Sequence, residues 1–174
     1  MIGLGLLLAI ASKKPSGGGS PSGSPWGSHS YWRVLLLATD GNSPYGNAFA
    51  GQNAQFYDHA GGTNLAVGGV ATSTQAYGGI PGPYDATHLF DGSTTNWSSV
   101  DTTSGQVVEY QFPAPVSVGA FGWQTRNDAY YHQAPTQFSI QFSDNGSTWT
   151  TAWSVTGAVW SQGEHQVFAD PNYV

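Results

Sequence analysis

The sequence contains no cysteine and few charged side chains. The absence of cysteine from all 174 residues excludes disulfides, thiolate metal ligands and cysteine nucleophiles. Charged residues make up 8% of the chain, whereas ordinary domains hold about 25%. The basic residues are Lys13, Lys14, Arg33 and Arg126, and the formal net charge is -6. Without a basic stripe to neutralise phosphates, we expect no nucleic acid partner.

Long hydrophobic runs are also missing. The apolar run 2–11 is shorter than the roughly 20 residues that a membrane-spanning helix requires, so we expect no membrane span. We predict instead that residues 1–14 form a hydrophobic anchor that docks onto copies of itself or onto a larger particle. The alternative is a signal peptide cleaved near Ala9-Ile10-Ala11, although Lys13 and Lys14 follow the run where a positive charge should precede it.

The next segment, residues 15–30, is rich in Gly, Ser and Pro. This composition predicts a linker without a core of its own. From residue 31 onward, short alternating runs are separated by Gly, Asn, Asp and Pro clusters, and aromatic residues are frequent. That pattern predicts a single all-β domain over residues 31–174, a sandwich rather than a helical fold.

The clearest predicted strand is 136–143, in which Phe138, Ile140 and Phe142 alternate with polar residues. The Asn145-Gly146 pair that follows predicts a tight hairpin turn into a second strand over 149–155. Further strands are predicted at 31–38, 53–57, 107–112, 116–126 and 164–168. The one helical signal is 84–90. We assign six tryptophans to core and rim packing: Trp32, Trp97, Trp123, Trp149, Trp153 and Trp160.

Several segments occur in the order of a known family's motifs. They are Ala86-Thr87-His88-Leu89-Phe90-Asp91-Gly92, Thr95-Asn96-Trp97-Ser98-Ser99, Val107-Val108-Glu109-Tyr110-Gln111-Phe112, Gly122-Trp123-Gln124-Thr125-Arg126-Asn127-Asp128 and the run from Ala134-Pro135 to Thr148-Trp149. The last is the most specific, being similar to "A-P-x-x-F-x-V-Q-x-S-D-D-G-x-T-W". Over residues 29–170 the chain thus resembles the discoidin, or coagulation factor 5/8 type C, domains. The resemblance implies a galactose-binding-domain-like jelly roll.

The order of the motifs differs from that of most family members. Their closing "R-Y-W-R-L" and "E-I-x-F" strands are similar to Tyr31-Trp32-Arg33-Val34-Leu35 and Ala54-Gln55-Phe56-Tyr57, which come first here. This order looks like a circular permutation, which is tolerated where termini lie together at a surface. Modules with a leading Tyr-Trp-Arg strand are similar to ones in bacteriophage tail and virion proteins.

The resemblance also implies a structural calcium ion beside the Asp-Gly turn. Its ligands would be Asp91, Thr95 and the carbonyl near His88, and hard oxygen ligands suit this ion. The family's glutamate falls near Asn53, which removes one negative charge from the site. The alternative is that Asp91 only caps a turn, as Asp before Gly often does.

A second candidate site is the loop that contains Arg126, Asn127, Asp128, Tyr130, Tyr131 and His132. Aromatic faces beside hydrogen-bonding groups are typical of sugar binding, so we predict a small polar ligand, a host-surface glycan, for this loop. The alternative is that Arg126 and Asp128 form an internal ion pair that braces the loop, with Tyr131 packed beneath it.

No catalytic residues are visible. The five histidines have no metal-ligand spacing, and Glu109 and Glu164 sit in no motif that pairs carboxylates across a cleft. We therefore expect a non-enzymatic virion structural protein of a bacteriophage, in the tail, a fibre or the capsid decoration. Its partners would be other virion proteins, copies of itself through residues 1–14, and a host glycan. The alternative is a secreted bacterial carbohydrate-binding module with a cleaved signal peptide.

Overall fold

The computed structural model describes residues 24–43, 48–100 and 104–173. The predicted anchor over residues 1–14, and the part of the predicted linker before residue 24, lie outside the described residues. Residues 24–30, which we expected to belong to the linker, lie on the folded body. Their aromatic side chains explain this, because the rings of Trp26 and His29 lie 6.0 and 4.0 Å from the ring of Phe142. The folded unit therefore begins before residue 31.

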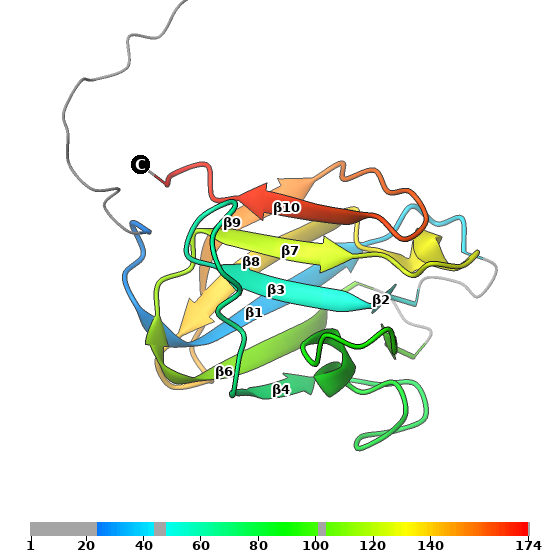
Figure 1. Cartoon of the computed structure of the whole chain (residues 1–174), viewed down its shortest axis with the longest axis horizontal. Helices are drawn as coiled ribbons and strands as arrows, with labels where there is room; N and C mark the ends of the chain where they lie inside the picture. Colours follow the sequence, from blue (N-terminus) through cyan, green and yellow to red (C-terminus); the bar gives the residue numbers. More distant parts are fainter. Residues whose placement is uncertain (1–23, 44–47, 101–103, 174) are drawn as a thin grey trace, which may run out of the picture.

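The described residues form an all-β protein, as the alternating pattern predicted (Figure 1). The strands are β1 (His29–Ala38), β2 (Ala50–Gly51), β3 (Asn53–Tyr57), β4 (Val70–Ser73), β5 (Trp97–Ser98), β6 (Gln106–Val116), β7 (Ala120–Gln124), β8 (Gln137–Ser143), β9 (Thr150–Thr156) and β10 (His165–Ala169). Two short 3-10 helices, η1 (Ala86–Leu89) and η2 (Tyr131–Gln133), interrupt the loops. No helix among the described residues is long and apolar enough to cross a membrane.

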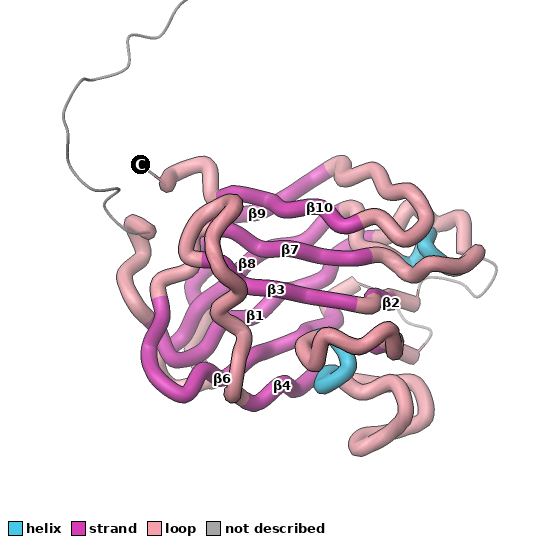
Figure 2. The backbone as a smooth tube through the Cα atoms, viewed as in Figure 1, coloured by secondary structure: helices cyan, strands magenta, loops and turns pink. Residues whose placement is uncertain are grey.

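Two antiparallel sheets pack face to face and make the jelly-roll sandwich (Figure 2). One sheet has the strand order β4-β6-β1-β8-β9 and the other the order β10-β7-β3, while β2 and β5 pair separately. Antiparallel pairing holds throughout, from β1 with β6 and β8 to β7 with β3 and β10. The first strand of the described chain is therefore the central strand of the larger sheet.

The core lies between the two sheets. In one row across three strands, Val34 of β1 pairs with Val108 of β6 and with Ile140 of β8, and all three are fully buried. Phe56 of β3 and Phe121 of β7 face this row from the smaller sheet, with their ring centroids 5.2 Å apart. Fully burying one such side chain contributes about 1.5–3 kcal/mol, so the interlocked aromatic and aliphatic side chains hold the sheets together.

The prediction of core or rim packing is confirmed for five of the six tryptophans. Trp32, Trp97 and Trp123 are fully buried, and Trp153 is nearly so. Trp160 packs against the core from the rim, where it is partly exposed. Trp149 is also half-exposed and lies under the guanidinium of Arg33, 3.9 Å from the ring centroid.

Two local predictions were wrong in detail. The β8–β9 hairpin is present, but its loop spans residues 144–149 and Gly146 alone adopts a positive φ of 67° there. Asn145 instead uses its side-chain oxygen to accept the N–H groups of Ser147 and Thr148, so a wider turn replaces the tight one. The predicted strand 116–126 is also divided, because residue 116 ends β6 and β7 begins only at residue 120.

Candidate functional site

Three loops meet at one end of the sandwich, at the right of Figure 1. They follow β1 (residues 39–43), β7 (residues 125–136) and β9 (residues 157–164). Hydrogen bonds join them: Trp160 donates its indole N–H to the carbonyl of Pro135 at 2.9 Å, and Gly163 donates its backbone N–H to the carbonyl of Arg126 at 3.0 Å. We call this region the loop end. Because the loops bond to one another, the loop end has a fixed shape before any ligand arrives.

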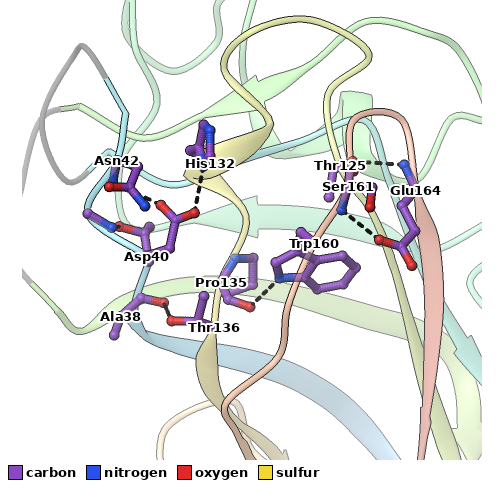
Figure 3. A network of polar contacts seen from close by, with 12 residues as sticks. Ala38, Asp40, Asn42, Thr125, His132, Pro135, Thr136, Trp160, Ser161 and Glu164 are labelled. Atoms are coloured by element: carbon purple, nitrogen blue, oxygen red, sulfur yellow. Dashed lines mark hydrogen bonds and ion pairs between the residues drawn. The ribbon is translucent and has the colours of Figure 1, made fainter.

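The first loop is fixed to the second by a contact between the side chains of Asp40 and His132. The carboxylate of Asp40 lies 2.6 Å from Nδ1 of His132 and also accepts the backbone N–H of Asn42 (Figure 3). Burial acts to raise the pKa of Asp40, but these hydrogen bonds outweigh it and hold the pKa below its ordinary value. Sequence reasoning missed Asp40, because 92 residues separate it from its partner.

The third loop is anchored by a cluster of short hydrogen bonds (Figure 3). The fully buried hydroxyl of Thr125 donates to the carbonyl of Ser161 at 2.8 Å and accepts the backbone N–H of Glu164 at 2.9 Å. The carboxylate of Glu164 in turn accepts the backbone N–H of Ser161 at 2.6 Å. Glu164 thus closes its own turn, and its carboxylate is engaged in that structural contact.

The predicted site residues lie in the middle of the loop end. Arg126 and Asp128 form a two-pronged ion pair, with Nη2 2.6 Å and Nε 3.0 Å from the carboxylate oxygens. The hydrogen bonds from Arg126 are the main reason that the pKa of Asp128 lies below its ordinary value. The guanidinium carbon of Arg126 also lies 4.9 Å from the ring centroid of Tyr130. The internal ion pair that we considered as the alternative role is therefore present.

The other predicted residues lie beside the ion pair of Arg126 and Asp128. The ring of Tyr131 lies 4.0 Å from the ring of His132, and both side chains are half-buried. Asn127 is exposed and accepts a long hydrogen bond of 3.4 Å from Gln162. The structure therefore brings the six predicted residues together on one surface. It adds Gln162 from the third loop, which no local sequence signal connects with Asn127.

The second predicted site, at the Asp-Gly turn, has the geometry of a turn cap. Asp91 accepts the backbone N–H of Ser93 at 2.7 Å, and its other oxygen lies 3.1 Å from Nδ1 of His88. Thr95 is exposed, and its backbone N–H donates to the hydroxyl of Ser93. Burial raises the pKa of Asp91, but these hydrogen bonds lower it further than burial raises it.

These residues fit calcium poorly. Asp91 is the single carboxylate among the predicted ligands, and both of its oxygens already face N–H groups or an imidazole nitrogen. Calcium usually takes six to eight oxygen ligands, several of them charged. No group of three or more His, Cys, Asp or Glu side chains in the described part of the chain is placed to hold a metal ion. The geometry favours the turn cap over a calcium site, and a calcium titration decides between these two roles of Asp91.

Comparison with known proteins agrees with the motifs. A sequence model of the F5/8 type C domain matches residues 69–172. No curated protein and no solved structure gave a match. Domains of this family are typically non-catalytic modules that bind carbohydrates or surfaces. Since the match covers more than half of the 174 residues and the fold is the expected all-β sandwich, the chain belongs to the F5/8 type C, or discoidin, domain family.

Proposed function

We propose that this domain attaches a particle to a host cell by binding a surface glycan at the loop end. The observation that carries the proposal is the fixed cluster of Arg126, Tyr131 and His132, held in place by Asp128 and Asp40. A site whose side chains are already positioned loses less conformational entropy on binding. This favours recognition of a small ligand by a few directional contacts.

The chemistry of the loop end suits a sugar. Exposed Asn127 and Gln162 offer amide donors and acceptors for hydroxyl groups, and the ring pair of Tyr131 and His132 offers an apolar face for the C–H side of a pyranose. The Arg126 charge is balanced by Asp128, which favours a neutral ligand over an anion. We infer that the bound group is an uncharged glycan residue.

The second part of the proposal is that the particle displaying this domain is a bacteriophage. It is supported by the similarity of the leading Tyr31-Trp32-Arg33 strand to phage virion modules and by the apolar segment 1–14 with a Gly/Ser/Pro linker after it. Many copies on one particle strengthen a weak contact, because linked sites raise avidity by about 10² to 10⁴. Deleting residues 1–14 should leave a folded domain that no longer joins particles; unchanged incorporation would contradict the anchor.

A secreted carbohydrate-binding module is the second candidate. The observation in its favour is the small-residue sequence Ala9-Ile10-Ala11, which resembles a cleavage site. Mass spectrometry of the mature protein distinguishes the two, because the secreted module would lack residues 1–11 and the virion protein would keep them.

Glycan-array binding by the full chain tests the ligand. Tyr131→Ala should abolish the array signal with only a small fall in the melting temperature, since the ring is half-buried and its hydroxyl forms no hydrogen bond in the described structure. Tyr77→Ala is the matched control, because Tyr77 is 61% exposed on a different loop. An array signal that survives Tyr131→Ala, or a multimeric chain that binds no glycan, would contradict the proposal.

A further inference from the structure

A hollow lies on the open side of the sandwich, and none of its lining residues belongs to the loop end. β3 and β4 are the edge strands of their sheets, and both edges face the same side (Figure 1). The segment between them crosses this side and covers part of it. The hollow has a volume of about 470 Å³ and is lined by Asn53, Gln55, Asn64, Ala66, Val67, Gly68, Gly69, Ala71, Thr87, Phe90, Asp91, Gly92 and Tyr110. That volume lies within the range of small-molecule sites, roughly 300–1,000 Å³.

Two aromatic rings form an apolar part of the wall. The ring centroids of Phe90 and Tyr110 are 4.8 Å apart, and Phe90 remains partly exposed. The hydroxyl of Tyr110 is fixed by the backbone N–H of Gly69 at 2.8 Å. A Cβ at Gly69 would lie 2.5 Å from the Tyr110 ring, so only glycine permits this close approach of the backbone to the wall.

Three side-chain amides supply unused hydrogen-bonding capacity. Asn64 accepts the N–H of Ala66 at 3.0 Å and Gln55 accepts the hydroxyl of Tyr57, each through its oxygen. Among the described residues, their NH₂ groups donate to no acceptor, and the amide of Asn53 has no partner at either end. All three are half-buried. In the described part of the chain, none of these NH₂ groups is among the fully buried atoms that lack a partner, so they reach solvent. A ligand hydroxyl can therefore take the place of water on them.

The charge of the lining narrows the ligand class. Asp91 is the one charged side chain among the described residues that line the hollow, and no Lys, Arg or His side chain is part of that lining. A carboxylate would repel a phosphate, a sulfate or an acidic sugar, and nothing in the lining would compensate that repulsion. Amide donors beside aromatic rings instead match the hydroxyl groups and C–H faces of a neutral sugar.

We propose that this hollow is a second binding site, which takes a neutral, hydroxyl-rich ligand the size of one or two sugar rings. Asn53, Gln55 and Asn64 donate to its hydroxyl oxygens, and the partly exposed ring of Phe90, supported from behind by the buried ring of Tyr110, covers its apolar face. The site shares no residue with the loop end, so one domain holds two separate contacts with a glycan. The test of this second site does not depend on whether the loop end binds a glycan.

Nuclear magnetic resonance titration of the ¹⁵N-labelled full chain tests the site. The probes are the methyl glycosides of glucose, galactose and N-acetylglucosamine, with glucuronate as the charged counterpart of glucose. We expect at least one neutral glycoside to shift the side-chain amide signals of Asn53, Gln55 and Asn64, and glucuronate to leave them unchanged. No shift of these signals with any neutral glycoside, or an equal shift with glucuronate, overturns the proposal.

Two variants then locate the contact. Asn53→Ala removes an amide that forms no hydrogen bond in the described structure, and it should weaken binding by about tenfold, the equivalent of one hydrogen bond. Val67→Trp, at a position 69% exposed, should block the hollow without entering the core. Gln137→Ala, an exposed amide on β8, is the matched control and should bind normally.

The resonances separate this site from the loop end. Shifts confined to residues 126–132, unaffected by Asn53→Ala and Val67→Trp, would overturn the second site and leave the loop end supported. Shifts confined to residues 53–69 and 90, lost in both variants, would support the second site and count against the loop end as the glycan contact.

Discussion

The indole N–H of Trp26 donates a 2.7 Å hydrogen bond to the carboxylate of Asp170, joining the two ends of the described chain across 144 positions of sequence. Asp170 is only 3% exposed, and its second oxygen accepts the backbone N–H of Asn172 at 2.8 Å. A buried carboxylate requires such donors, because burying an unpaired charge is costly. The contact therefore holds the first described residues beside the segment that follows β10.

The first prediction follows from this bond. Trp26→Phe keeps an aromatic ring beside Phe142 but leaves one carboxylate oxygen of Asp170 without its donor. We expect the free energy of unfolding to fall by about 1–3 kcal/mol, measured by urea denaturation. Trp149→Phe is the control, because no hydrogen bond of the Trp149 indole accompanies its contact with Arg33; an equal loss in the two variants would contradict the role of the bond.

The second prediction concerns the order of the strands. The family match begins at residue 69, yet β1 lies between β6 and β8 in the larger sheet and β3 pairs with β7 in the smaller one. Residues 69–172 alone would therefore lack a central strand. If the chain is a circular permutation of the common order, a protein that starts at residue 69 and joins residue 173 to residue 24 by a short linker should fold.

The melting curve of the permuted chain provides the measurement. We expect cooperative unfolding within a few degrees of the natural order, because the same strand pairs form and the ends already lie together. A truncated chain of residues 69–173 is the control and should not fold. A permuted chain that behaves like the truncated one would contradict the permutation.

Periodicity predicted the strands that bury one face. The bounds of β3 were predicted without error, and those of β8 to within one residue, because their apolar residues alternate with polar ones. β4 was missed because its side chains alternate between exposed and half-buried and none of them is fully buried. β2 and β5 have two residues each, too few to show a period.

The candidate sites were predictable only where the partners are close in sequence. Arg126 and Asp128 are two residues apart, so their ion pair could be weighed from the sequence. The contact of His132 with Asp40, and the position of Asn53 and Tyr110 around one hollow, depend on how the sheets fold back on each other. No local pattern contains that information, since it is set by strand pairing over long separations.

The third prediction tests the ion pair of Arg126 and Asp128 by the pH dependence of the free energy of unfolding. The pKa of Asp128 is lowered in the folded state, so its ion pair with Arg126 stabilises the fold above the unfolded carboxyl pKa of about 4. That stability is lost as the pH falls through the lower folded value. Asp128→Asn should reduce the free energy of unfolding by about 0.5–1 kcal/mol at pH 7, because the pair is partly exposed.

Urea denaturation across the acid range measures this difference. The gap between wild type and Asp128→Asn should close as the pH falls below about 4, where the carboxyl becomes protonated. A gap that stays constant over that range would show that the amide disturbs the loop for reasons other than charge.

The fourth prediction concerns Glu109 on β6, which lies opposite Arg33 in the register of strands β6 and β1. Burial raises the pKa of Glu109, and the charge of Arg33 only partly offsets this. A raised pKa means that stability is highest below the unfolded value and falls as the pH rises through the folded value. Glu109→Gln should therefore increase the free energy of unfolding at pH 7 by up to about 0.5 kcal/mol, with the gain vanishing near pH 4. A loss at pH 7 would show instead that attraction to Arg33 dominates.

The fifth prediction decides between the two roles of Asp91. As a turn cap, its carboxylate holds the backbone N–H of Ser93. Asp91→Ala should then lower the free energy of unfolding by about 1 kcal/mol, equally with calcium and with a chelator, because one hydrogen bond is lost in either condition. A calcium ligand would behave differently, since an ion that binds only the folded state raises the melting temperature as its concentration increases. A calcium-dependent rise in wild type that Asp91→Asn and Thr95→Ala abolish would establish the metal site, and the geometry of the turn leads us to expect no such rise.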